Sequence, residues 1–193
     1  MNLEREVVLS HGDNTGGFLV VSDLHLGRGL RAGVVPLRPN ETDEALISML
    51  DHHRNLGPPG GWTLVLNGDA LDFVSILDVP EQSADFEVSA DERICGLRPG
   101  PHQSAWKLRR ILEWHTGVLA ALARFVAQGH RLVILPGNHD PEWAWPEVRQ
   151  AMLDLLDKAA GRSVREQVRF GERGCRLDGQ THIEHGHAFD PYC

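Results

Sequence analysis

Side chains that commonly bind metals follow directly on short apolar runs in this sequence. Residues 18–21 lead into Asp23 and His25, and residues 63–66 lead into Asp69. Carboxylate oxygens together with imidazole nitrogens suit Mn²⁺, Fe or Zn²⁺ better than Ca²⁺, which prefers oxygen ligands alone. These positions therefore predict metal-dependent chemistry.

The arrangement recurs twice more along the chain. Residues 132–135 lead into Gly137-Asn138-His139-Asp140, and a weaker run over 181–184 leads into His185-Gly186-His187. Each motif alone is more simply explained as a turn or a helix cap, because Gly, Asn and Asp favour turns. Four such recurrences favour a shared site, since ligands of open α/β sheets bind beyond the carboxyl ends of the strands. We therefore expect these side chains at one edge of one sheet.

The elements that position these residues alternate between strands and helices. The apolar runs have the length and composition of buried parallel strands. Further strands are expected over 164–170, 174–177 and 181–185, with a hairpin turn at Asp178-Gly179, and helices over 41–55, about 104–128 and 147–160. This order predicts an α/β fold with parallel strands at its start. Residues 73–104 lack a clear period and predict a lid, a binding loop or an insertion.

Length and composition narrow the class of protein. The 193 residues are expected to form one domain, 1–193, with 41% hydrophobic residues and a formal net charge of −8. This acidity argues against a dedicated non-specific nucleic-acid binder, which needs a basic surface. The three cysteines form no CxxC pair, which is typical of a reducing compartment. The sequence shows neither a membrane-length apolar stretch nor a signal peptide, so we expect a cytoplasmic protein.

The four motifs together resemble the signature of the calcineurin-like metallophosphoesterase superfamily. Asp23-Leu24-His25, Gly68-Asp69-Ala70-Leu71-Asp72 and Gly137-Asn138-His139-Asp140 match its first three blocks, and His185 matches its fourth. The resemblance covers about residues 17–187. It implies an α/β/β/α sandwich with mixed sheets flanked by helices.

The resemblance also implies a centre of two divalent metal ions, with Mn²⁺ the leading candidate and Fe or Zn²⁺ the alternatives. Asp23 and His25 would hold one ion, Asp69 would bridge both, and Asn138 with His185 would hold the second.

Two further roles follow from the same resemblance. His139 would contact the phosphate and its leaving group, and Asp140 would orient His139. Asp72 would support the centre from behind, although the N-cap of a helix explains it equally well.

The implied activity is hydrolysis of a phosphomonoester, phosphodiester or pyrophosphate bond in a small-molecule or nucleotide substrate. A hydroxide that bridges the two ions would attack phosphorus, because paired cations stabilise both the attacking and the departing oxygen. Two alternatives stay open. One is a degenerate, non-catalytic member that uses the scaffold for binding, and the other is a nucleotide or nucleic-acid phosphodiesterase.

The sequence departs from the family signature near its end. The closing Gly-His-x-His block is missing, because Gly186-His187-Ala188-Phe189 has no second histidine. We expect a domain truncated before that block. The alternative is that His187 partly substitutes for it.

Overall fold

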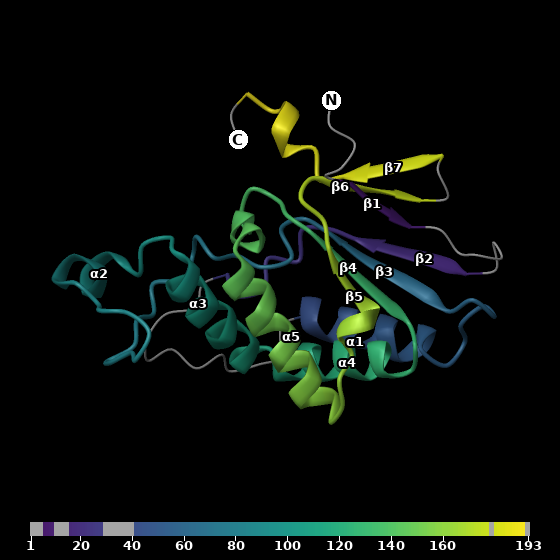
Figure 1. Ribbon diagram of the computed structural model, residues 1–193, viewed down its shortest axis with the longest axis horizontal. Coiled ribbons are helices and arrows are strands. Elements are labelled where there is room, and N and C mark those ends of the chain that lie inside the picture. The colour runs from purple at the N-terminus through teal and green to yellow at the C-terminus, as the bar shows by residue number, and fades with distance from the viewer. Residues whose placement is uncertain (1–5, 10–15, 29–40, 178–179, 192–193) are drawn as a thin grey trace.

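A parallel four-stranded sheet forms the centre of the computed structural model, which describes residues 6–9, 16–28, 41–177 and 180–191. Its strands lie in the order β2-β3-β4-β5 (Figure 1). Their bounds are Gly17–Val21 for β2, Trp62–Asn67 for β3, Arg131–Leu135 for β4 and Val168–Phe170 for β5. The three predicted apolar runs are thus confirmed as neighbouring parallel strands.

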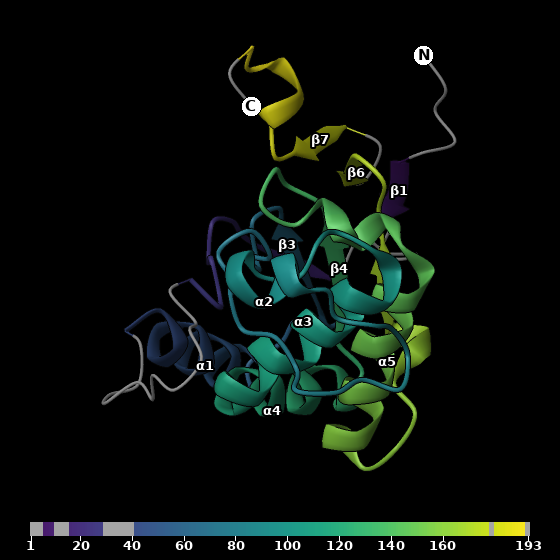
Figure 2. The same cartoon turned by 90° about the vertical axis from the view of Figure 1, so that its left-hand side faces the viewer.

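Four helices cover one face of this sheet (Figures 1 and 2). They are α1 (Glu41–His53), α3 (Pro101–Trp114), α4 (Thr116–Ala127) and α5 (Pro146–Ala160). Alternate residues of the strands point toward them: Leu64 and Leu66 join the helical core, whereas Val65 joins a second core on the opposite face. Strands that are apolar on both faces are typical of a covered parallel sheet.

A smaller sheet packs on that opposite face. It has the order β1-β6-β7, with bounds Glu6–Leu9, Gly174–Leu177 and Thr181–Glu184. β1 runs parallel to β6 and β6 antiparallel to β7, so this sheet is mixed whereas the larger one is wholly parallel. Val133 and Leu135 of β4 meet Cys175 and Leu177 of β6 between the sheets.

The prediction of one sheet edge is wrong for His185, because β7, which precedes it, belongs to the smaller sheet. The predicted strand 164–170 is also shorter than expected. Only its last three residues are extended, since the short helix η3 (Arg165–Gln167) precedes them. The predicted turn at Asp178-Gly179 lies outside the described residues.

The single helix predicted over 104–128 is wrong as well. The first helix of this region, α3, begins at Pro101, and proline suits the first turn of a helix because it has no backbone N–H to satisfy. The helix then breaks at His115, whose backbone (φ −105°, ψ 42°) leaves the helical region. The imidazole of His115 is held by two partners outside both helices, as described below.

The segment that joins β3 to α3 is ordered by local polar contacts. It contains α2 (Ala90–Cys95), whose N-terminus has a capping box between Ser89 and Glu92. Hydrogen bonds from the backbone and the hydroxyl of Ser89 lower the pKa of Glu92 to about 2. Arg110 of α3 is paired with Asp78 of this segment. A lid function for the segment stays a prediction.

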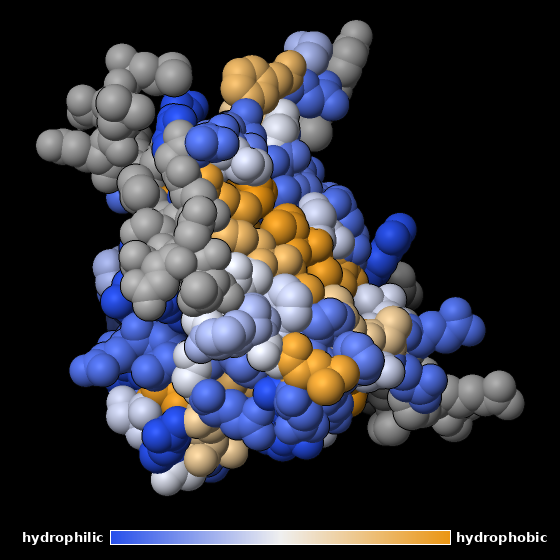
Figure 3. All heavy atoms as spheres, turned by 90° about the vertical axis from the view of Figure 1, so that its right-hand side faces the viewer, coloured by the Kyte–Doolittle hydropathy of each residue, from blue (hydrophilic) through white to orange (hydrophobic). Residues whose placement is uncertain are grey.

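The described residues therefore form layers of helices, sheet and sheet, which agrees with the α/β class expected from the resemblance. Two further short helices, η2 (Pro141–Ala144) and η4 (His187–Phe189), follow motifs of the sequence. Figure 3 shows apolar side chains open to view on one face of the molecule, surrounded by hydrophilic ones. Among the described residues, no helix has the length and apolar character needed to cross a bilayer.

Candidate metal centre

The loops that follow β2, β3 and β4 meet the residue that follows β7. Backbone hydrogen bonds join the first two loops: the N–H of Asp23 donates to Gly68 O (3.2 Å) and that of His25 to Asp69 O (2.9 Å). Gly68 N–H in turn donates to Leu135 O at the end of β4 (3.1 Å). These bonds hold the ends of three strands at one place.

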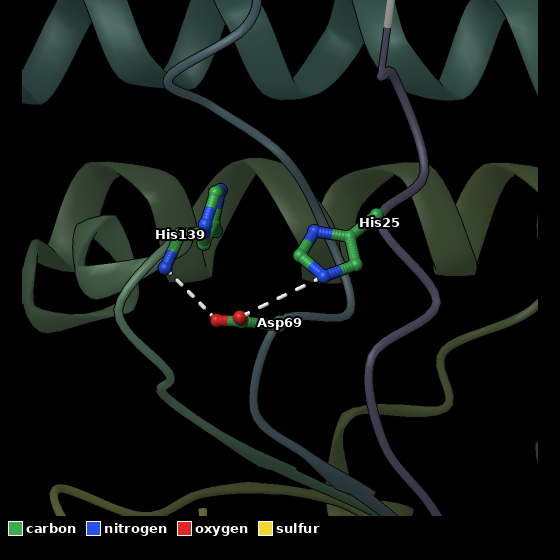
Figure 4. A group of neighbouring side chains, drawn as sticks. All are labelled: His25, Asp69 and His139. Carbon is green, nitrogen blue, oxygen red and sulfur yellow. Dashed lines mark hydrogen bonds and ion pairs between the residues drawn. The ribbon is translucent and has the colours of Figure 1, made fainter. Parts of the chain in front are cut away.

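Asp69 lies at the middle of this place. Its side chain is almost fully buried, and Oδ1 accepts the backbone N–H of His139 at 2.9 Å. Oδ2 lies 3.8 Å from His25 Nε2 and 3.4 Å from His185 Nε2. Figure 4 shows the carboxylate between His25 and His139. Asp69 therefore lies close to the imidazoles of two separate loops and accepts a hydrogen bond from the backbone of a third.

Two groups of three side chains could each hold a cation. One consists of His25, Asp69 and His139, and the other of Asp23, Asp69 and His185, and within each group the ligand atoms lie within 4.8 Å of one another. The two groups share Asp69, as a bridging carboxylate would require. Their mixed oxygen and nitrogen donors fit divalent transition metals.

The backbone at these ligands is strained. Asp23, His25 and Asp69 have φ angles of 57°, 47° and 51°, and among the described residues they are the only ones other than glycine with positive φ. The left-handed region costs a residue with a side chain about 1–2 kcal/mol. Such strain persists where the surrounding structure fixes it, and it clusters at functional sites.

Two glycines make room for the cluster. A Cβ on Gly137 would lie 2.1 Å from Asp69 Oδ1, and a Cβ on Gly68 would lie 2.5 Å from Cγ of His185. Any side chain at either position would displace a candidate ligand. The glycines of the two motifs are therefore required by close approach, in addition to their role in turns.

The ring of His185 is oriented by the backbone of β3. Its Nδ1 lies 3.0 Å from Asn67 O, so Nδ1 carries the hydrogen and Nε2 keeps its lone pair. Nε2 points toward the centre, where it lies 3.3 Å from Asn138 Oδ1. A hydrogen bond on the outer nitrogen is the usual way in which a metal-binding histidine is held.

Ser22 belongs to the site and sequence reasoning missed it. Its Oγ donates to Asn67 O at 3.0 Å and also contacts the carboxylate of Asp23. The only signal in the sequence is a hydroxyl residue directly before a candidate ligand.

The carboxylate of Asp72 lies near the Nδ1 atoms of two of the imidazoles. Its Oδ1 lies 3.3 Å from His139 Nδ1 and its Oδ2 lies 3.9 Å from His25 Nδ1. No helix begins after Asp72, so the N-cap alternative is wrong; its carboxylate accepts the N–H and Oγ–H of Ser75 in a turn. Burial by itself raises the pKa of Asp72, but the hydrogen bonds from Ser75 and His139 outweigh it and leave that pKa below its ordinary value.

Asp140 does not orient His139, contrary to expectation. Its buried carboxylate accepts five hydrogen bonds, none of them from the imidazole of His139. The donors are the backbone N–H groups of Asp69, Ala70, Leu71 and Gly137 and the indole of Trp143. Burial raises the pKa of Asp140, although these hydrogen bonds act in the opposite direction. Asp140 thus joins the loop after β3 to the turn after β4, and Asp72 is the carboxylate that holds His139.

The family model for calcineurin-like phosphoesterases matches residues 17–192 of this sequence. The chain belongs to the calcineurin-like phosphoesterase family. The comparison with curated proteins and the comparison with solved structures gave no match. The family is one of metal-dependent phosphoesterases, and the two ligand groups around Asp69 agree with that general activity.

The structure of this family member brings the five candidate ligands close together. Asp23, His25, Asp69, Asn138 and His185 surround the centre, and His139 lies at its edge with its ring 4.8 Å from that of His25. The ring of His187 lies 5.4 Å from that of His185. The assignment of these residues to particular ions stays a prediction.

Proposed function

We propose that this chain is a dinuclear metal-dependent phosphoesterase. It would hydrolyse a phosphomonoester, phosphodiester or pyrophosphate bond of a small molecule or nucleotide. The observation that carries this proposal is that Asp69 belongs to both ligand groups. A carboxylate that belongs to both ligand groups is what a two-metal centre would use to join its ions.

The proposed ligands divide between the two ions as the family resemblance implies. Asp23 and His25 would hold one ion and Asn138 with His185 the other, with Asp69 between them. Divalent cations, Mn²⁺ foremost and Fe or Zn²⁺ next, would supply Lewis acidity toward water and toward the phosphate oxygens. The strained backbone at Asp23, His25 and Asp69 supports the proposal, because such strain clusters at functional sites.

His139 is the proposed acid toward the leaving group. Asp72 accepts from its Nδ1 and its backbone N–H is fixed on Asp69, so both ends of the residue are held. Nε2 is then the nitrogen left to give a proton to the departing oxygen. General acid catalysis of this kind contributes roughly 10²- to 10⁴-fold.

The test combines metal binding with turnover. Metal-free protein is titrated with Mn²⁺ by calorimetry and assayed with bis-p-nitrophenyl phosphate, p-nitrophenyl phosphate and a nucleoside diphosphate derivative. We expect two ions per chain, and loss of both tight binding and turnover in Asp69→Asn. His139→Asn should keep two ions and lose about 10²- to 10⁴-fold in turnover.

His102→Ala is the matched control, since His102 is an exposed histidine of α3 and belongs to none of the four motifs. Turnover that Asp69→Asn and His139→Asn leave unchanged would overturn the assignment. Two bound ions without turnover of any of these substrates would favour the non-catalytic alternative.

A further inference from the structure

We propose that His115, together with Asp43, is a positioning residue for the loop that carries Asp23 and His25. It acts through the backbone N–H of Gly27. This inference rests on the proposed function, because it concerns the ion that Asp23 and His25 would hold.

The three groups form a continuous chain of hydrogen bonds. Gly27 N–H donates to His115 Nε2 at 3.1 Å, and His115 Nδ1 lies 2.7 Å from Asp43 Oδ2. Because Nε2 accepts, the hydrogen of this imidazole is on Nδ1 and points to the carboxylate. The side chains of His115 and Asp43 are only 11% and 14% exposed, so water competes little for these bonds.

His115 reaches Gly27 because the helix breaks there. It lies between α3 and α4, and its own N–H still bonds to Ile111 O in the last turn of α3. Gly27 lies against the same turn: a Cβ on it would be 2.8 Å from Ile111 Cγ1. The break therefore places the imidazole next to the backbone of the ligand loop.

The ligand loop needs such support. His25 is held at a φ of 47°, and Gly27, two residues later, has a φ of 95°. Two backbone hydrogen bonds join the loop after β2 to the loop after β3: His25 N–H donates to Asp69 O, and Leu26 N–H donates to Ala70 O. The hydrogen bond from Gly27 to His115 attaches the C-terminal end of this strained segment to the joint between α3 and α4. Without it the left-handed conformation of His25 loses one of the contacts that oppose its strain.

The effect should be confined to one ion. The chain of hydrogen bonds ends on the loop after β2, whereas His185 is oriented separately by Asn67 O. With the ligands assigned as proposed above, loss of His115 should therefore weaken the ion held by Asp23 and His25 and spare the one held by Asn138 and His185.

The protein offers a matched control in His130. Its Nδ1 accepts the N–H of Trp62 at 3.2 Å, its Nε2 lies 3.1 Å from Arg54 O, and it is 7% exposed. His130 is thus a second buried histidine that bridges two backbone groups. It contacts the first residue of β3, at the opposite end of the strand from the candidate centre.

The experiment compares the two Mn²⁺ affinities of metal-free protein in His115→Asn, His115→Gln and His130→Ala. Asparagine places its amide at the position of Nδ1 and keeps the contact with Asp43, whereas glutamine places an oxygen near the position of Nε2 and keeps the acceptor for Gly27. We expect His115→Asn to weaken one of two affinities by about three- to tenfold, the effect of one hydrogen bond. His115→Gln should lie within about twofold of the wild type, and His130→Ala should change neither affinity.

Hydrogen exchange of the Gly27 amide is the second readout, since it reports the proposed bond whatever the metal content. Its protection should fall in His115→Asn and persist in His115→Gln. Two intact Mn²⁺ sites with unchanged affinities in His115→Asn would overturn this inference alone, as would equal weakening in His130→Ala. A wild type that does not bind two ions would overturn the proposed function and this inference together.

Discussion

Glu142 is expected to make the stability of the folded chain depend on pH near neutrality. It lies in η2, directly after the third motif, and it is 6% exposed. Its Oε2 is buried without a hydrogen bond among the described residues. Burial raises the pKa of Glu142 from its ordinary value of 4.5 to about 7, although its own backbone N–H and the charge of Lys107 act in the opposite direction.

The magnitude follows from these two pKa values. Between pH 4.5 and 7 the folded chain keeps a proton on Glu142 that the unfolded chain has lost, so stability falls as the pH rises through this range. Each tenfold change in an acid constant is worth about 1.4 kcal/mol, so the full loss is about 3 kcal/mol. Above pH 7 both states are ionised and the loss is complete.

Glu142→Gln removes this titration while keeping the size of the side chain. The free energy of unfolding of both proteins is measured with urea from pH 5 to pH 8, in the presence of a chelator so that metal binding does not contribute. We expect the variant to gain about 2–3 kcal/mol over the wild type across this range. The attraction to Lys107 acts only on the ionised carboxylate, and its effect is already contained in the pKa of about 7.

Glu92→Gln is the control, because the same chemical change is expected to act with the opposite sign. The pKa of Glu92 is lowered to about 2, so its contribution to stability is present above pH 4.5 and is lost as the pH falls toward 2. The difference between Glu92→Gln and the wild type should therefore be flat from pH 5 to pH 8. A flat difference for Glu142→Gln would refute the reasoning about its burial.

Two further variants test the supports of the centre. Asp140→Asn replaces a carboxylate that accepts five hydrogen bonds by an amide with one oxygen. It should lower the free energy of unfolding in urea by about 2–4 kcal/mol. An unchanged unfolding midpoint would contradict this prediction. Gly137→Ala should lower the free energy of unfolding by about 1–3 kcal/mol and abolish tight Mn²⁺ binding in calorimetry, because its Cβ would lie 2.1 Å from Asp69 Oδ1. Gly129→Ala is the control: its Cβ would meet no atom within 4 Å, so it should lower the free energy of unfolding through its positive φ alone and bind Mn²⁺ normally. Normal Mn²⁺ binding by Gly137→Ala would contradict the prediction and show that the turn can move.

The strands and most of the candidate ligands could be predicted from sequence because their signals are local. An apolar run such as 132–135 is buried on both faces of the parallel sheet, and polar residues that follow it must lie at the sheet edge. The helix over 41–55 was predicted within two residues of α1, since its apolar positions recur at helical spacing.

The break at His115 could not be predicted, because it depends on partners far away in the chain. The apolar residues around His115 keep a helical period without interruption. The imidazole instead makes hydrogen bonds to Asp43 and Gly27, which lie far away in the sequence. The orientation of His139 was predicted for Asp140, whereas Asp72 makes that contact, for a similar reason. Sequence spacing places Asp140 beside His139, but the buried N–H groups of two loops take its oxygens.

The residue types of the centre, their order and their attachment to the ends of apolar strands can be predicted from local sequence, because they depend on neighbours along the chain. Three features depend on long-range packing: His185 follows a strand of a second sheet, Asp69 is shared by two ligand groups, and the joint between α3 and α4 makes a hydrogen bond to the first ligand loop. These features arise from contacts between segments that lie tens of residues apart. Such contacts are selected by packing and hydrogen bonding of the whole fold, which local spacing does not encode.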